Sequence, residues 1–544
     1  MKIERILIED QMAPIGLDEK KPAFSWLLTA EEGEQNLMQS ACRIVVRTGE
    51  DTVWDSGKME TGVSTGIGYE GEALQPCTKY EVKAEVWDNH GGKAEAESSF
   101  ETGLMDSLYA AWEGAEWIGA PHATVCAENR GVFTIESEFR MEGGKGEAGI
   151  VFGANDFRLN DHTKNELGME GENYIRYAVC LEDGDARLEI YRVGYAPEDT
   201  AEKPFAVTKL VNWKEKTQEI LTPENADAFH KLTVEVDGNV AYAYVDGILV
   251  DAIEEHGFFG TKVSGRQLNP RGNNDVLPYP RLNEIGFYAG KGTTGYFKNL
   301  TVRNVRKPSA EIVRETPEGR LDGGKSIFAD QIPVENGYFK VEDSQITADP
   351  SHHSIPMLRS CISCQKEKKL ASARLYITAR GIYDCRINGQ EITEDLLRPG
   401  LTQYDHRMNY QTYDITGLMK PGRNGIGVTL ASGWWSEAQT FVVKNFNYFG
   451  DKESLLAKVV MKYEDGSREV FGTNTEDWKY FGEGPYLFSS YFAGEQYDAR
   501  RAEVYETYSL PEFDDSTWEK PVVVDTVMIE EFCTMPGFGR SWPA

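Results

Sequence analysis

The chain has 544 residues, of which 40% are hydrophobic and 27% are charged, and its formal net charge is −31. This length is enough for three or four domains, and the composition is that of a globular chain rather than a disordered one. So negative a charge argues against nucleic-acid partners, because proteins bind phosphate mainly through Lys and Arg side chains.

The sequence has no signal for a membrane or for export. A run of about 18 apolar residues is absent, so we expect no membrane span. Residues 1–10 alternate charged and apolar side chains, which predicts a strand instead of a signal peptide. Eight cysteines are few for this length, so we expect a cytoplasmic protein with reduced thiols. Cys361 and Cys364 lack a second pair of ligands at metal spacing, which argues against zinc.

Strand patterns begin at the N-terminus and predict a first unit at residues 1–105. Residues 41–48 and 80–87 are apolar or alternating, and residues 88–92 form a polar turn with two glycines. Short strands at regular spacing over roughly 100 residues are typical of a β-sandwich of the fibronectin III type. Residues 106–119 are expected to form a linker.

A second β unit is predicted at residues 120–305. Two hairpins are expected, at 174–191 and 230–245, each with an Asp- and Gly-containing turn between two apolar strands. This size and pattern predict a jelly roll, in which two sheets pack face to face. The polar residues 306–330 are expected to form another linker.

Residues 331–526 predict a third β unit, again a jelly roll. Asn-Gly and Asp-Gly turns separate its strands, and residues 527–544 are expected to be a C-terminal stub. Persistent helical periodicity is missing, so we expect an all-β chain. The strands of this unit include residues 373–378, 382–387, 425–430 and 455–463.

An ordered series of motifs runs through the first and third units. The first unit and its linker contain Pro22-Ala-Phe-Ser-Trp26, Val53-Trp-Asp-Ser-Gly-Lys58, Phe100-Glu-Thr-Gly103 and Trp117-Ile-Gly119. The third unit contains Pro356-Met-Leu-Arg359, Ile387-Asn-Gly389, Arg398-Pro-Gly-Leu-Thr402, Gly433-Trp-Trp435, Gly494-Glu-Gln-Tyr-Asp-Ala-Arg500 and Phe513-Asp-Asp-Ser-Thr-Trp518. This series resembles that of bacterial α-L-rhamnosidases, glycoside hydrolase family 78, over about residues 1–119 and 350–526.

The resemblance implies an enzyme that removes terminal α-L-rhamnose from plant glycosides or polysaccharides with inversion. In the family the catalytic acid and base lie on an (α/α)6 barrel after the third unit, and this chain stops where that barrel should start. We therefore interpret the chain as the N-terminal accessory part of such an enzyme, inactive alone, with a barrel in cis or in trans as its partner. The alternative is a stand-alone carbohydrate-binding or scaffold protein.

The middle unit is a departure from the simplest family members, in which only a short segment separates the Trp-Ile-Gly motif from the Leu-Arg motif. Its closing strands are similar to concanavalin- and laminin-G-like jelly rolls, and some family members carry a sugar-binding jelly roll at this place. Three polar loops, Asn155–Asp156, Asn160–His162 and Asn269–Asp275, could supply oxygen ligands to calcium or to a sugar. Ordinary solvated loops are the favoured alternative, and calcium is the one cofactor considered.

Candidate sugar contacts in the third unit are Trp434 and Trp435, with Tyr404, Asp405 and Arg407 in a loop nearby in the sequence. Aromatic rings bind the apolar C–H faces of sugars, and adjacent polar groups fix the hydroxyls. Packing of the two tryptophans in a core or against another domain is the favoured alternative.

Catalytic residues are not predicted in this chain. Inverting hydrolysis needs one carboxylic acid and one carboxylate on opposite sides of the scissile bond. Glu495 and Asp498 form the most suggestive pair, but we expect them to belong to a strand-end network that pairs with Arg500.

Overall fold

A computed structural model describes most of the chain, and all structural statements below concern those residues. The described ranges are 1–30, 32–121, 132–155, 173–195, 198–210, 220–237, 240–250, 262–264, 268, 282–305, 307–321, 323–350, 354–436, 449–450, 452–491, 494–524 and 531–534. Strands dominate them, which confirms the prediction of a mostly β chain. The α-helices labelled α3 (Gly433–Ser436) and α4 (Ala502–Thr507) are short. Within these ranges no helix is long and apolar enough to cross a bilayer.

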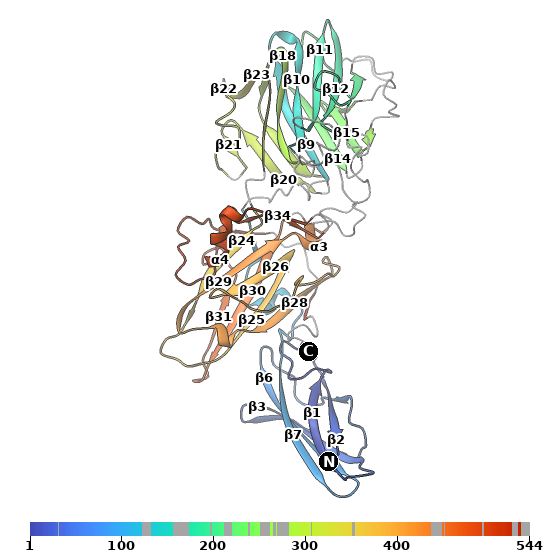
Figure 1. Cartoon of the computed structure of the whole chain (residues 1–544), viewed down its shortest axis with the longest axis vertical. Coiled ribbons are helices and arrows are strands. Elements are labelled where there is room, and N and C mark those ends of the chain that lie inside the picture. The colour runs from blue at the N-terminus through green and yellow to red at the C-terminus, as the bar shows by residue number, and fades with distance from the viewer. Residues whose placement is uncertain are drawn as a thin grey trace.

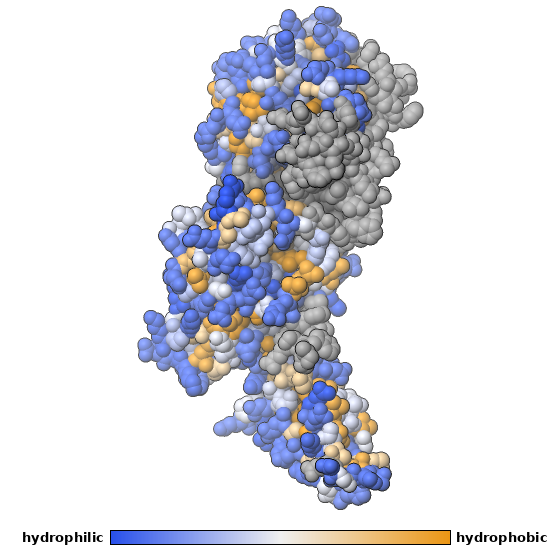
Figure 2. Space-filling view, in the orientation of Figure 1, coloured by the Kyte–Doolittle hydropathy of each residue, from blue (hydrophilic) through white to orange (hydrophobic). Residues whose placement is uncertain are grey.

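Figure 1 shows three bodies arranged along one long axis. The body built from the C-terminal strands lies between the other two, so the order in space differs from the order in the sequence. We keep the names first, middle and third unit for the strand groups described next. The face seen in Figure 2 is mostly hydrophilic where it is described, in keeping with the net charge of −31.

The first unit is a sandwich of a three-stranded and a four-stranded sheet, ordered β1-β2-β5 and β4-β3-β6-β7. Alternate residues of β6 are buried, as the sequence pattern predicts, and Trp26 and Phe24 from β2 fill the space between the sheets. The buried Trp26 indole donates a hydrogen bond to Gln39 at 2.9 Å. The strands are β1 (Lys2–Ile8), β2 (Ala23–Thr29), β3 (Gln39–Thr48), β4 (Asp51–Asp55), β5 (Ile67–Gly68), β6 (Lys79–Asp88) and β7 (Lys93–Glu101).

The middle unit is built around one continuous strand path, β13-β12-β11-β10-β18-β9-β14-β15-β16. Its core is aromatic and aliphatic, with Phe133, Phe287 and Phe297 fully buried. The strands on the path are β9 (Val132–Met141), β10 (Gly146–Ala154), β11 (Tyr174–Glu182), β12 (Asp185–Val193), β13 (Ala206–Lys209), β14 (His230–Asp237), β15 (Val240–Val245), β16 (Ile248–Leu249) and β18 (Glu284–Phe297). Off the path lie β17 (Lys262–Ser264), β19 (Leu300–Asn304), β20 (Lys307–Thr316), β21 (Gly319–Arg320), β22 (Val334–Glu335) and β23 (Tyr338–Ala348).

The C-terminal limit of the middle unit differs from the expected one. Where a linker was expected at 306–330, β20 pairs with β19, and Ile312 and Val313 join the middle core. Strand β23, expected in the third unit, pairs with β18 from Ile285↔Ala348 to Phe297↔Phe339. Strand β23 joins the middle unit because its residues Phe339 and Val341 are buried in the middle core. The prediction was wrong because the residue pattern of a strand indicates which face is buried but does not identify the neighbouring strand.

The third unit consists of a five-stranded and a seven-stranded sheet. The five-stranded sheet is ordered β27-β26-β29-β24-β32, and the larger sheet follows the path β35-β8-β30-β25-β28-β36, with β31 beside β30. The strands are β24 (Met357–Cys364), β25 (Leu370–Arg380), β26 (Ile382–Ile387), β27 (Gln390–Glu391), β28 (Arg407–Asp414), β29 (Gly422–Ala431), β30 (Ser454–Tyr463), β31 (Arg468–Gly472), β32 (Lys479–Phe481), β35 (Val522–Val523) and β36 (Glu531–Thr534). A separate hairpin joins β33 (Tyr486–Ser490) to β34 (Gly494–Tyr497).

Strand β8 (Ile118–Gly119) belongs to the third unit, although it precedes the middle unit in the sequence. It pairs with β30 and with β35, and Trp117 beside it is buried. The expected linker at 106–119 therefore ends in a strand of the third unit. The middle unit is an insertion between β8 and β24.

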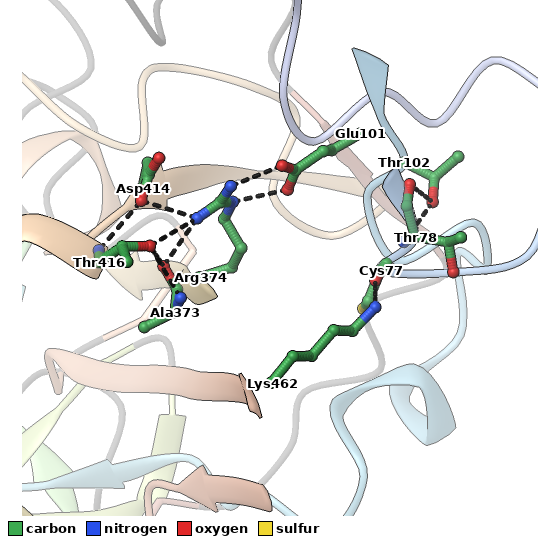
Figure 3. A network of polar contacts seen from close by, with 9 residues as sticks. All are labelled: Cys77, Thr78, Glu101, Thr102, Ala373, Arg374, Asp414, Thr416 and Lys462. Carbon is green, nitrogen blue, oxygen red and sulfur yellow. Dashed lines mark hydrogen bonds and ion pairs between the residues drawn. The ribbon is translucent and has the colours of Figure 1, made fainter. Parts of the chain in front are cut away.

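The first and third units are joined by a polar network with a buried centre (Figure 3). Arg374 of β25 donates to both carboxylate oxygens of Glu101, at 2.6 and 2.5 Å, and to Asp414 at 2.7 Å. The side chains of Arg374 and Glu101 are only 12% and 15% exposed, so water screens the pair weakly. Lys462 adds a 2.6 Å bond to the carbonyl of Cys77 in the first unit. These contacts fix the first unit against the larger sheet of the third.

A second charged contact fastens the segment that leads from β7 to β8. Glu113 accepts hydrogen bonds from Arg468 and from Lys458, whose side chain is 1% exposed. The Arg468 guanidinium lowers the pKa of the Glu113 carboxyl to about 2, and Lys458 lowers it further against the opposing effect of burial. The carboxylate thus holds two cations of the third unit.

We predict that Arg374→Met destabilises the junction by about 3 kcal/mol, because Glu101 is left buried without its cation. The measurement is chemical denaturation of the full chain followed by circular dichroism and tryptophan fluorescence. The matched control is Lys83→Met, which removes an exposed partner of Glu95 and should cost less than about 1 kcal/mol. Equal losses in both variants would contradict a buried role for Arg374.

We predict that Glu113→Gln flattens the acid dependence of stability. Because the folded-state pKa lies near 2 and the usual value is 4.5, this carboxylate stabilises the fold above pH 4.5 and loses that contribution as the pH falls toward 2. The effect should be modest, since 37% of the side chain is exposed to screening solvent. The measurement is the melting temperature of the variant and of the natural chain from pH 6 down to pH 2.5, roughly the window of the pKa shift. The two melting temperatures should differ at pH 6 and converge at the acid end. A constant difference across the range would contradict the assignment.

Candidate functional site

Two of the five predicted sugar contacts, Trp435 and Tyr404, lie inside the third unit. They are 3% and 1% exposed, and their ring centroids are 5.7 Å apart. The Trp435 indole donates to the carbonyl of Lys452 at 3.0 Å, and the Tyr404 hydroxyl donates to the carbonyl of Gly400 at 2.8 Å. The guanidinium of Arg380 lies 5.2 Å from the Trp435 ring. Both residues therefore pack in a core, the alternative that the sequence favoured.

The other three predicted residues lie nearer the surface and do not form one cluster. Trp434 is half-buried and packs on Tyr491, with ring centroids 4.4 Å apart. Asp405 and Arg407 are exposed, on the loop before β28 and at its first residue. The structure therefore brings Trp435 together with Tyr404 and places Trp434 against a different aromatic ring.

The short helix α3, which carries the two tryptophans, begins at Gly433. Its φ is +51°, and a Cβ at this position would lie 2.7 Å from the side chain of Ile382. A larger residue is therefore excluded on both conformational and steric grounds. Consecutive residues of a helix point in different directions, so Trp435 is buried while Trp434 is half-buried at the edge of the same aromatic cluster. Gly433 itself lines a cleft.

The cleft has a volume of about 350 Å³ and lies over β26 and β29 of the five-stranded sheet. The hairpin β33–β34, helix α4 and the loop before Arg398 form its walls. The volume falls in the range of small-molecule sites. Its lining residues are Ile355, Ile382, Tyr383, Asp384, Leu396, Leu397, Arg398, Thr429, Ala431, Gly433, Tyr486, Ser489, Tyr491, Glu495 and Tyr505. We name it the tyrosine cleft, after Tyr486, Tyr491 and Tyr505.

An ion pair with fixed geometry lies in the tyrosine cleft. Arg398, only 7% exposed, donates from Nη2 to Asp384 Oδ1 at 2.9 Å, and the Tyr505 hydroxyl donates to Oδ2 at 3.2 Å. Burial raises the pKa of the Tyr505 hydroxyl, so this group stays a neutral donor. The rest of the Arg398 guanidinium is buried inside the protein, where it interacts with the Tyr413 hydroxyl. The site thus presents one acceptor, the Asp384 carboxylate, in a fixed orientation.

Aromatic and apolar side chains form the rest of the walls. The rings of Tyr486 and Tyr505 are 5.2 Å apart and meet edge to face, and both side chains are half-buried. Leu396 is 82% exposed and Leu397 is 49% exposed at the rim. Sequence reasoning missed these residues, because only their convergence in space distinguishes them from other tyrosines and leucines.

Glu495 and Asp498, the carboxylate pair suggested by the sequence, have different hydrogen-bond partners. Asp498 accepts two bonds from Arg500 at 2.8 Å, which lower the pKa of its carboxyl to about 2, so the predicted pairing with Arg500 is confirmed. Glu495 is exposed, lines the tyrosine cleft and accepts a 3.2 Å bond from Ser489. The two carboxylates therefore serve different contacts.

The polar loops expected to offer calcium ligands lie mostly outside the described residues, at 156–172 and 269–281. Asn155, which is described, donates to Glu284 at 2.8 Å. In the described part of the chain, three or more His, Cys, Asp or Glu side chains nowhere gather in a way that could hold a metal ion. Calcium in the middle unit remains a proposal.

A second aromatic and charged cluster lies on the middle unit, and it is packed rather than open. Arg176 of β11 is 3% exposed, and its guanidinium lies 3.8 Å from the ring of Tyr191 and 3.7 Å from that of Tyr288. Glu147 accepts a bond from the Tyr288 hydroxyl at 3.0 Å. Since the guanidinium fills the space between the rings, this cluster offers no open ring face between Tyr191 and Tyr288.

Two family models match the chain. The α-L-rhamnosidase N-terminal domain matches residues 368–534, within the third unit, and the Rha78A-like N-terminal immunoglobulin domain matches residues 3–106, the first unit. Both models describe N-terminal domains of α-L-rhamnosidases, so the first and third units are similar to that part of the family. The resemblance expected from the ordered motifs is thereby confirmed.

Individual relatives agree with this assignment. An α-L-rhamnosidase of Streptomyces avermitilis is 27% identical over 523 residues, which cover 94% of this chain and 44% of that enzyme. One from Formosa agariphila is 37% identical over 152 residues, 28% of this chain and 16% of that protein. The chain thus spans less than half the length of the curated relatives that it matches.

A solved structure shares the fold. The crystal structure of the Streptomyces avermitilis α-L-rhamnosidase, complexed with L-rhamnose, has a TM-score of 0.55 and 21% identity. The similarity covers 98% of this chain and 46% of that one. The arrangement of the three β units is therefore similar to part of a rhamnosidase.

We predict that Trp435→Ala costs about 3–5 kcal/mol of folding free energy, because it removes a buried ring that packs on Tyr404 and Phe449. Trp434→Ala is the matched control, and it should cost less since Trp434 is only half-buried. Urea denaturation of both variants provides the comparison. A Trp435→Ala variant as stable as Trp434→Ala would contradict the packing role.

Proposed function

We propose that the chain is the non-catalytic β portion of an α-L-rhamnosidase. The whole enzyme would hydrolyse terminal α-L-rhamnose from plant glycosides or polysaccharides with inversion. The observation that carries this proposal is the similarity over 523 residues to the Streptomyces avermitilis enzyme, which covers nearly all of this chain but 44% of that protein. The first and third units would serve as a scaffold for the catalytic part.

The chemistry of the cleft carboxylates supports a non-catalytic role. Inverting hydrolysis uses two carboxyl groups about 6.5–9.5 Å apart, one protonated and one free to activate water. Asp384 instead accepts hydrogen bonds from Arg398 and Tyr505, and its orientation is fixed by both. We infer that the acid and base come from an (α/α)6 barrel, in cis or in trans.

A stand-alone carbohydrate-binding protein is the second candidate function. The observation that favours it is the tyrosine cleft, which combines half-buried rings with a fixed donor–acceptor pair. The middle unit would add a second sugar site if its polar loops bind calcium. Both roles are compatible with the first proposal, since a binding site retains substrate near the catalytic part.

We predict that this chain alone releases no rhamnose from an aryl α-L-rhamnoside above the buffer background, because a positioned acid and base are required for turnover. Release of the chromogenic aglycone over hours, with the Streptomyces avermitilis enzyme as positive control, is the measurement. Turnover that copurifies with the chain and disappears in Asp384→Asn would contradict the proposal and assign catalysis to the cleft.

A further inference from the structure

We propose that the tyrosine cleft of the third unit is a binding site for a neutral pyranose sugar. The site is built from the five-stranded sheet, the β33–β34 hairpin and α4, which together enclose about 350 Å³. The choice of L-rhamnose as first probe rests on the proposed function. The site itself rests on the geometry that follows.

The aromatic walls provide the apolar half of the recognition. Tyr486 and Tyr505 meet edge to face, and Tyr505 also stacks on the buried ring of Tyr508, with an interplanar angle of 21°. The Arg386 guanidinium also lies 4.6 Å from the centroid of the Tyr505 ring, so Tyr505 is held by protein groups and serves as a fixed wall. The half-buried ring of Tyr486 is the one we assign to the C–H face of a pyranose.

The pair of Asp384 and Arg398 provides the polar half. A carboxylate accepts hydrogen bonds, so that of Asp384 matches neighbouring hydroxyls of one sugar ring. Asp384 is already held by Arg398 Nη2 and the Tyr505 hydroxyl, so its carboxylate is oriented before a ligand arrives. A carboxylate has about four lone-pair sites, so it can accept further hydrogen bonds from sugar hydroxyls.

The charge of the cleft selects a neutral ligand. Asp384 and Glu495 carry two negative charges and Arg398 one positive charge, so the lining is acidic overall. The whole chain carries −31, which repels anions further. Phosphates and uronic acids are therefore disfavoured, whereas a neutral sugar meets no repulsion. Leu396 and Leu397 at the rim suit its less polar edge.

The test is calorimetric titration of the full chain with L-rhamnose, D-galactose, D-glucose and D-glucuronate, in EDTA and again in calcium. We expect saturable binding of at least one neutral sugar in EDTA and none of D-glucuronate. Asp384→Asn should weaken that binding about tenfold to a hundredfold, because it removes a charged acceptor. Asp514→Asn is the matched control, since Asp514 is exposed in the same unit and bonds only to Ser516 in the described contacts; its affinity should be unchanged.

Tyr486→Ala is the second variant, because Asp384→Asn leaves the buried Arg398 without its anion and could unfold. It should also weaken binding about tenfold or more, at an unchanged melting temperature. Sugar binding that persists in both folded variants, or no saturable binding of any neutral sugar, would overturn the proposal. Binding of another neutral sugar but not of L-rhamnose, lost in these variants, would support the cleft and count against the rhamnosidase assignment.

Discussion

The structure depends on the return of the chain to one sheet after a long insertion. Strand β8, only two residues long, pairs with β30 and β35, and the bonds from Glu116 to Thr473 at 2.7 Å and from Val524 to Trp117 at 2.9 Å extend that contact. Trp117 is buried, and Arg380 lies 4.4 Å from its ring. Because both ends of the insertion are held in the third unit, the middle unit closes a core of its own between them. The third unit therefore connects the other two.

The polar junction with the first unit has a different physical character from this sheet closure. Arg374, Glu101 and Asp414 form a network that is specific in geometry but gains little net energy, since desolvation opposes the attraction of a buried pair. Tyr410 adds a neutral contact, because its hydroxyl donates to Asp18 at 2.6 Å and accepts from the backbone of Leu104 at 2.9 Å. The network thus sets the orientation of the first unit, and apolar packing supplies the stability.

Local pattern predicted the strands well and the boundaries poorly. The alternation in β6 and the turn at Asp88 follow from side-chain periodicity, which a sequence displays directly. The membership of β8 and β23 depends on partners far away in the sequence, such as the pairing of Phe297 with Phe339. The same limit applies to the site. Adjacent tryptophans are visible in the sequence, but Asp384, Tyr486 and Tyr505 converge only after three separate elements have folded.

The tyrosine cleft lies toward the middle unit, although all of its lining residues belong to the third unit. In Figure 1 the labels β34, α3 and α4 lie at the end of the third unit nearest the middle unit. A ligand in the cleft would therefore lie on the side of the third unit that faces the middle unit. If both units bind neighbouring residues of one polysaccharide chain, the second contact becomes intramolecular, and the overall affinity rises through effective concentration without any new interaction. Two sites that are each weak for a monosaccharide would then suffice to retain a polymer.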